Sequence, residues 1–397
     1  MHTIRILTAG ESHGKALTGI IEGVPSGFSL SPEDINADLK RRQGGYGRGG
    51  RMSIESDQAD IISGIRWGKT LGSPITVQIE NKDWKNWLAG MSIFRHDKGA
   101  IPSITRPRPG HADLPGALKF NTKDIRDILE RSSARETAMR VALGAIAKKI
   151  LSDFGVVIGS YVKQIGDISY RHNRLFTEKD LIKLLHAAEK SSVRCPDKHI
   201  SAAMVRHIDN AIKEKNTLGG VFTVFATGVP VGLGSHIQWD RKLDGRLAQA
   251  LMSIQAIKGV EVGDGFSAAA HPGSEVMDEI YYGPSSTTKC PGFYRKTNHA
   301  GGVEGGISNG MPILVTAAMK PIPTLRKPLM SVDLLTKKSF SAAYERSDTC
   351  AVPAAAVVAE AMAALVLADA FFEKFGGNSK EEVNRNYKNY LSYLKTF

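Results

Sequence analysis

The sequence predicts a layered protein that mixes helices and strands, in an α/β or α+β arrangement. Short runs of β-branched and apolar residues alternate along the chain with longer segments of helical periodicity. A glycine, an apolar run and the pattern GVPxG occur at 19–27 and again at 220–232, and each copy leads toward a helix. This echo indicates two related halves, but two short matches also arise by chance, so duplication stays open at this point.

The individual elements follow from composition and end signals. Strands are predicted at 4–9, 17–22, 75–80, 156–162, 221–227 and 313–319. Ser133 and Glu136 have capping-box spacing ahead of an apolar face, which predicts a helix to about Asp153. Further helices are predicted from Thr177 with Asp180, from 197 to about 218, from 242 to 254, and from Pro353 to the glycines at 376–377.

Bulk composition limits the classes of protein. The chain has 397 residues, of which 42% are hydrophobic, so it can bury a sizeable core. A formal net charge of +12 favours anionic partners, but no run of five or more Lys/Arg favours a nucleic-acid polymer. Cys195, Cys290 and Cys350 are widely spaced, so neither disulfides nor a metal site is indicated, and a reducing cytoplasm fits best.

Neither a signal peptide nor a membrane span is expected. The N-terminus lacks the basic, apolar and small-residue segments of a signal peptide. The apolar segment 351–372 contains Glu360 and Asp369, which favours a buried core helix. We expect one catalytic domain over 1–375, followed by a polar tail over 376–397 that holds a short helix.

Histidine and arginine motifs indicate a site for a small, densely charged anion. His13 lies in GESHG, where it is either a proton donor or acceptor or a structural histidine bonded to a glycine turn. His111 follows a Pro-Gly turn, which favours an exposed functional loop. Arginines cluster at 40–51, 105–113, 130–136 and 345–350. A helix beginning at Ser133 adds free backbone N–H groups that favour an anion.

Two of these motifs leave alternatives open. The segment RRQGGYGRGGR is typical of a loop whose arginines hold carboxylates or phosphate, and also of a flexible RNA-binding segment. Asp348 is either a catalytic base or a helix cap paired with Arg346. Neither a Walker A sequence nor a Rossmann fingerprint is present.

Taken together, GESHGKALTGIIEGVP, RPGHAD, RSSARETAMRVALGAIA, SIQAIKGVEVGDGF, NHAGGVEGGISNG and RSD resemble the chorismate synthase family, in order from about Thr3 to Ala370. The resemblance implies an α+β, layered β-α-β sandwich with an internal pseudo-repeat, assembled as a homotetramer. It also implies a lyase of the shikimate pathway, which makes the precursor of the aromatic amino acids. The reaction is a 1,4-anti elimination of phosphate from 5-enolpyruvylshikimate 3-phosphate, with reduced FMN and no net redox change.

The resemblance also implies roles for particular residues. His13 would donate a proton near the departing phosphate, His111 would act near the flavin ring, and Asp348 would assist proton removal at flavin N5. For the substrate we expect Arg42, Arg48, Arg108 and Arg135, although the first two are sometimes assigned to NADPH in this family. For FMN, the family pattern gives Arg131, Ser132, Ser133, Gln255, Ala256, Gly305, Lys320, Pro321, Ile322, Pro323, Thr324 and Arg346. Gln255 stands where many relatives have Asn.

Partners and competing functions complete the expectations. We expect NADPH only as a source of reducing equivalents, an external flavin reductase, and neither a nucleic-acid nor a membrane partner. A basic nucleic-acid-binding protein and a flavin oxidoreductase are the alternatives. The first predicts binding that collapses with salt, and the second predicts accumulated oxidised flavin.

Overall fold

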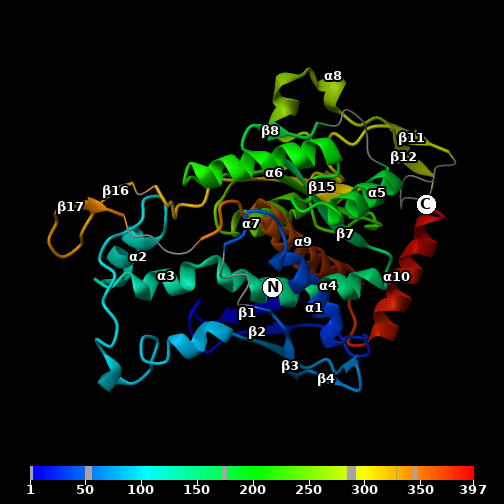
Figure 1. The fold of residues 1–397 in the computed structure, drawn as a ribbon. Coiled ribbons are helices and arrows are strands. Elements are labelled where there is room, and N and C mark those ends of the chain that lie inside the picture. The colour runs from blue at the N-terminus through cyan, green and yellow to red at the C-terminus, as the bar shows by residue number, and fades with distance from the viewer. Residues whose placement is uncertain (1–2, 50–55, 172–176, 284–291, 328, 343–346) are drawn as a thin grey trace.

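The computed structural model describes residues 3–49, 56–171, 177–283, 292–327, 329–342 and 347–397. Its centre is a layer of helices enclosed between two antiparallel sheets (Figure 1). The protein is therefore an α+β sandwich in β-α-β layers, as expected.

The two sheets lie far apart in sequence. The first has the order β1 (Arg5–Ala9), β2 (Ala16–Glu22), β6 (Ile75–Glu80), β3 (Asp60–Ser63). The second has the order β10 (Ile257–Val262), β15 (Ile313–Met319), β9 (Gly220–Thr227), β7 (Val157–Ile165), β8 (Ile168–Ser169). Along β2 and β6 buried and accessible side chains alternate, because only one face of this sheet meets the helices.

The central layer contains α1 (Pro32–Gln43), α4 (Thr137–Ser152), α7 (Leu243–Met252) and α9 (Val352–Phe375). Helices α4 and α9 cross closely, since a Cβ added at Gly144 would lie 2.4 Å from the Cβ of Ala361. Helices α5 (Glu178–Glu189) and α6 (Lys198–Lys213) cover the outer face of the second sheet. The C-terminal α10 (Lys380–Leu394) packs on α9 through Val383 and Tyr387.

Smaller elements complete the described chain. The short strands are β4 (Ile65–Arg66), β5 (Lys69–Thr70), β11 (Ile280–Tyr282), β12 (Phe293–Arg295), β13 (Val303–Glu304), β14 (Ile307–Ser308), β16 (Met330–Val332) and β17 (Ser339–Ser341). The short helices are α2 (Asp113–Phe120), α3 (Arg126–Ser132) and α8 (Gly273–Val276). Single 3₁₀ turns are η2 (Lys82–Asn86), η3 (Arg95–Asp97), η4 (Ala134–Glu136), η5 (Trp239–Arg241) and η6 (Gly265–Ala270).

The two halves of the chain repeat one topology. The order β1-β2-β6-β3 in the first sheet matches β7-β9-β15-β10 in the second, and α1 and α7 each follow the second strand in sequence. The two GVPxG loops occupy equivalent places after β2 and β9. A Cβ added at Gly23 would lie 1.8 Å from Thr3 O, and one at Gly228 would lie 2.1 Å from Gly155 O. Both glycines also have positive φ, so the echo reflects one shared backbone requirement.

Some predicted boundaries need correction. All six predicted strands form, whereas β3 and β10 were not predicted. The helix predicted over 197–218 ends at Lys213, because Lys215 turns into the left-handed region at φ 59°. The capping box at Ser133 forms only in part. Ser133 Oγ accepts a hydrogen bond from Arg135 N at 3.3 Å, but Glu136 is turned away toward Arg140.

Helix α9 is the only described helix that is long and apolar enough to span a membrane. Of its most apolar window, 94% is buried inside the protein. Helix α4 and strands β7 and β9 cover it, so it is a core helix, as predicted.

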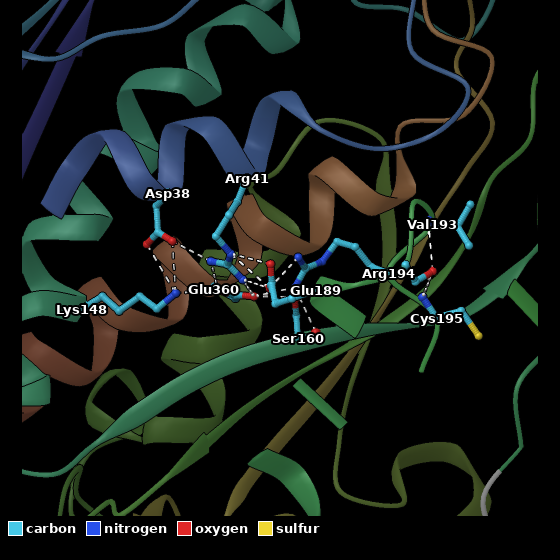
Figure 2. A network of polar contacts seen from close by, with 10 residues as sticks. Asp38, Arg41, Lys148, Ser160, Glu189, Val193, Arg194, Cys195 and Glu360 are labelled. Carbon is cyan, nitrogen blue, oxygen red and sulfur yellow. Dashed lines mark hydrogen bonds and ion pairs between the residues drawn. The ribbon is translucent and has the colours of Figure 1, made fainter. Parts of the chain in front are cut away.

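One buried ionic network ties α9 to its neighbours (Figure 2). Glu360 on α9 is 1% exposed and accepts from Arg41 Nη1 at 2.7 Å and Nη2 at 2.8 Å. It also accepts from Lys148 Nζ at 2.7 Å, Arg194 Nη2 at 3.1 Å and Ser160 Oγ at 2.6 Å. Burial favours the neutral acid, but Lys148 and Arg41 outweigh it and hold the pKa of Glu360 well below its usual range. The network fixes the end of α1 that carries Arg42.

Candidate active site

Two predicted arginines are held in a buried ionic cluster beside the N-terminal end of α4. Arg135 donates from Nη1 to Asp57 Oδ1 at 2.5 Å and from Nε to Asn81 Oδ1 at 2.9 Å. Arg42 donates from Nε to Thr137 Oγ1 at 3.1 Å. Helices α1 and α4 pack together, which brings these cations from distant segments to one place.

Arg42 keeps unused hydrogen-bonding capacity in this cluster. Its Nη1 lies 3.7 Å from Asp57 Oδ2, too far for a hydrogen bond, and within the described chain both buried atoms lack a hydrogen-bond partner. Burial and the charges of Arg48 and Arg135 lower the pKa of Arg42 to about 10, although Asp57 opposes them. The group remains cationic at neutral pH and presents a donor that an incoming anion would satisfy.

Arg48 and Asp348 form the next part of the site. Arg48 Nη1 lies 2.9 Å from Asp348 Oδ2, and Gly49 N donates to Asp348 Oδ1 at 2.7 Å. The N-cap of α9 is Ala351, so Asp348 does not cap that helix. The carboxylate instead pins the 47–49 loop against the segment that precedes α9, which also bonds through Thr349 N to Gly47 O at 2.8 Å.

His111 and Arg108 share one buried carboxylate. Asp113, 1% exposed, accepts from Arg108 Nε at 2.8 Å and from its Nη2 at 3.0 Å. His111 Nδ1 lies 2.5 Å from Asp113 Oδ1. Burial favours protonation of Asp113, but His111 and Arg108 lower its pKa well below the usual range. Arg108 also donates to Thr324 Oγ1 at 3.1 Å, which joins this group to the 320–324 segment.

His13 is bonded to a second buried carboxylate. Its Nδ1 lies 2.8 Å from Oε1 of Glu130 on α3, and its backbone N donates to Glu130 Oε2 at 2.8 Å. The imidazole stacks on Trp87 with ring centroids 4.2 Å apart, and the Arg126 guanidinium lies over the same indole at 4.6 Å. His13 is thus a fixed, partly buried side chain.

These groups form one connected site. Asn81 links Arg135 to the His13 loop by donating to Gly14 O at 2.8 Å, and Ser12 Oγ donates to Ser133 Oγ at 3.1 Å. On the other side, Ser347 Oγ donates to Thr324 O at 3.0 Å, immediately before Asp348. The first of these groups holds His13, Arg42 and Arg135, and the second holds Arg48, Arg108, His111 and Asp348. The charges of Arg48 and Asp348 act on Arg42 and so join the two.

Three of the predicted cofactor residues lie at the junction of α3 and η4. Ser133 bonds to Ser12 and to Arg135 N. Ser132 Oγ donates back to Ile128 O at 2.9 Å, and Arg131 is exposed and donates to Thr8 O at 2.7 Å.

Residues 255–256 and 320–324 meet at the edge of the second sheet. Gln255 Nε2 donates to Glu136 Oε1 at 2.7 Å, while its buried Oε1 lacks a hydrogen-bond partner in the described chain. Ala256 has φ 66°, a strained value for a residue with a side chain, and its carbonyl accepts from Lys320 N at 2.9 Å. Glu136 places this edge next to Arg135, so the cofactor candidates border the arginine cluster.

One described cofactor candidate, Gly305, is not brought to this place. Gly305 lies in the β13–β14 turn, which precedes the Ile313 end of β15, whereas Lys320 follows the other end at Met319. Residues 301–310 are also mostly buried, although Gly305 itself is exposed. Arg346 lies outside the described residues, as does Cys290.

The sequence motifs missed several partners of the predicted residues. Asp57, Asn81 and Glu130 carry no local pattern, whereas Asp113 stands two residues after His111 in RPGHAD, a spacing that could have indicated it. Within the residues that the structure describes, no group of three or more His, Cys, Asp or Glu side chains is arranged to hold a metal ion.

The chain is similar to known proteins over nearly its whole length. The family model described as chorismate synthase matches residues 4–372. The chorismate synthase of Geobacter metallireducens is 57% identical over 396 residues, which cover 99% of this chain and 100% of that protein. That of Aquifex aeolicus is 54% identical over 402 residues, 99% of each chain. A solved structure titled "Crystal Structure of Chorismate Synthase" has a TM-score of 0.80 and 45% identity and covers 99% of both chains.

Proposed function

Because this chain belongs to the chorismate synthase family, we propose that its connected ionic site is where substrate and reduced FMN bind and react. The family reaction is the elimination of phosphate from the small substrate 5-enolpyruvylshikimate 3-phosphate, which gives chorismate in the shikimate pathway. The nucleic-acid and flavin-oxidoreductase alternatives are thereby set aside.

The convergence of four arginines carries this proposal. Arg42, Arg48, Arg108 and Arg135 are all nearly buried, with side-chain exposures of 6%, 11%, 9% and 6%. The substrate carries two carboxylates and a phosphate, and guanidinium groups bind both in fork geometry. Existing carboxylate partners hold the forks in place, so little side-chain entropy is lost on binding. The unused Nη1 of Arg42 supports a direct contact with the substrate.

The proton transfers are assigned to His13, His111 and Asp348. Each histidine meets a carboxylate through Nδ1, so we assign proton exchange with a ligand to Nε2. Nε2 of His111 also lies 3.4 Å from Arg108 Nη2. By this assignment His13 donates to the departing phosphate and His111 acts beside the cofactor. Asp348 lies next to Arg48 and assists proton removal.

The residues at the Gln255 edge suit a flavin mononucleotide. The buried Gln255 Oε1 is an acceptor that lacks a donor, and Lys320 adds a cation beside it in the fold. Ser132 and Ser133 would offer hydroxyls, and Arg131 a positive charge, to the cofactor phosphate. Pro321, Ile322, Pro323 and Thr324 would line its other side, and Gly305 and Arg346 remain expectations of the family pattern. Reduced FMN, when bound, supplies transient electron density that assists phosphate loss.

Assembly and location belong to the same proposal. We place the protein in the cytoplasm, since the described cysteines Cys195 and Cys350 are free and buried. A homotetramer is supported by exposed apolar side chains such as Met330 on β16, at 70% exposure. NADPH acts only as a source of electrons, delivered by a separate flavin reductase.

Anaerobic phosphate release and chorismate absorbance from 5-enolpyruvylshikimate 3-phosphate test the proposal. We expect turnover with chemically reduced FMN and none with oxidised FMN plus NADPH. Turnover in both mixtures would show that the chain reduces its own flavin. The absence of turnover in both mixtures would overturn the assignment of this site.

A further inference from the structure

The strongest unassigned feature is the carboxylate beneath His13. Glu130 is 2% exposed and meets His13 twice, through the ring Nδ1 at 2.8 Å and the backbone N at 2.8 Å. Two contacts from one carboxylate fix both the position of the residue and the rotation of its ring. No family motif named this residue, and the contact joins positions 117 apart in sequence.

The chemistry of a carboxylate decides which ring nitrogen carries hydrogen. An ionised carboxylate can only accept, so Nδ1 must be the donor in this contact. The pKa of Glu130 is lowered: burial opposes ionisation, but the His13 ring and backbone N–H and the Arg126 charge outweigh it. Within the described chain His13 Nε2 makes no hydrogen bond, so it is the nitrogen left for a ligand.

We propose that Glu130 is a positioning residue, which keeps a hydrogen on Nδ1 of His13 and aims its Nε2 at the substrate phosphate. This rests on the proposed role of His13. In the elimination the substrate C–O bond breaks with its electron pair going to phosphate, and the electron pair of the C–H bond that is lost forms the new double bond. A proton moves from Nε2 of the imidazolium to a phosphate oxygen. His13 is left neutral with Nδ1–H still bonded to Glu130, ready to be protonated again at Nε2 from solvent.

The groups around Glu130 provide a matched control. Arg126 Nη1 lies 3.2 Å from Glu130 Oε1 and is the other charge on this carboxylate. If Glu130 only stabilised α3, it would do so through its ion pair with Arg126, because both residues lie on that helix. Arg126→Gln removes the ion pair, together with the guanidinium over Trp87, and leaves the contact between Glu130 and His13 in place.

The test compares Glu130→Gln, Glu130→Asp and Arg126→Gln in the full chain. The readouts are kcat and KM for phosphate release with reduced FMN, and ¹⁵N spectra of imidazole-labelled protein, assigned by difference from His13→Ala. A glutamine can accept from or donate to Nδ1, so E130Q should show mixed tautomers. We expect its kcat to fall by about 10- to 100-fold, less than the ~10²- to 10⁴-fold that general acid catalysis itself contributes, with KM nearly unchanged. R126Q should keep the Nδ1–H signature and most of the activity.

The outcomes separate this inference from the proposed function. If His13→Ala slows turnover while E130Q keeps both the tautomer and the rate, the positioning role is overturned alone. It is also overturned if R126Q reproduces the E130Q defects. If His13→Ala turns over at the wild-type rate, the proposed acid and its positioning residue both fail. Should E130Q not fold, E130D serves, because its shorter carboxylate cannot keep both contacts and should show the same mixed tautomers.

Discussion

Replacing Glu360 by glutamine should destabilise the protein more than any exposed charge change. Glu360 Oε2 accepts from Arg41 Nη1 and Lys148 Nζ, both at 2.7 Å, and Oε1 accepts from Arg41, Arg194 and Ser160. In Glu360→Gln the amide NH₂ must face two of these donors. The buried cations are then left without the negative charge that balances them. Breaking a buried ion pair on one side typically costs about 3–5 kcal/mol, and we expect a loss of that size.

Urea unfolding, followed by circular dichroism and by tryptophan fluorescence, measures this loss where the two transitions coincide. Glu189→Gln is the matched control, since it removes the same charge from the same network, from a side chain that is 33% exposed. We expect it to cost below about 1 kcal/mol. An E360Q loss under about 1 kcal/mol, or equal losses in both variants, would refute the reasoning.

Four further predictions concern catalysis and stability. His111→Ala should lower kcat by roughly 10²-fold and leave FMN binding, measured by fluorescence titration, nearly intact; near wild-type phosphate release would contradict its role. Arg48→Ala should raise the substrate KM more than it weakens FMN binding, and equal losses would place this arginine elsewhere. Gly144→Ala should cost about 1–3 kcal/mol in urea, because its Cβ would lie 2.4 Å from that of Ala361, while Gly273→Ala, with nothing within 4 Å, should be neutral. The lowered pKa of Glu360 means that the unfolded chain binds more protons in acid, so urea midpoints should fall as pH drops below the ordinary value of 4.5, and less so in E360Q.

Strands were predicted well where local sequence alone defines them. Pro74 and Pro312 bound two β-branched runs, and β6 and β15 form over the predicted residues. Strand β10 was not predicted, because Gly259 interrupts it and its strand conformation depends on pairing with β15. Helix α1 was also missed. Its signal, Ser31 followed by Pro32 and Asp34, is present in the sequence. The last turn of α1 overlaps the segment RRQGGYGRGGR, which was expected to form a loop.

The histidines and arginines of the candidate site were predictable from the sequence, but several of the residues that bind them were not. The histidines and arginines stand in recognisable motifs together with Asp113 and Asp348, whereas their partners Asp57 and Asn81 do not. Arg135 finds Asp57 at a separation of 78 residues and Asn81 at 54. Such partners are selected by the packing of α4 against the first sheet and against α1, and no periodicity in the chain encodes that packing.

Helix α9 has a consequence for how the protein is made. It is the last long segment of the core, yet it contacts α1, α4, α7 and the strands β7 and β9. A ribosome releases residues 352–375 only after both sheets and α4 have emerged, so the inner face of the second sheet, where α9 packs on β7 and β9, stays partly uncovered until then. The nascent chain is therefore exposed to aggregation and proteolysis until α9 has emerged, and termination before residue 352 would leave α4 and the strands β7 and β9 without this packing partner.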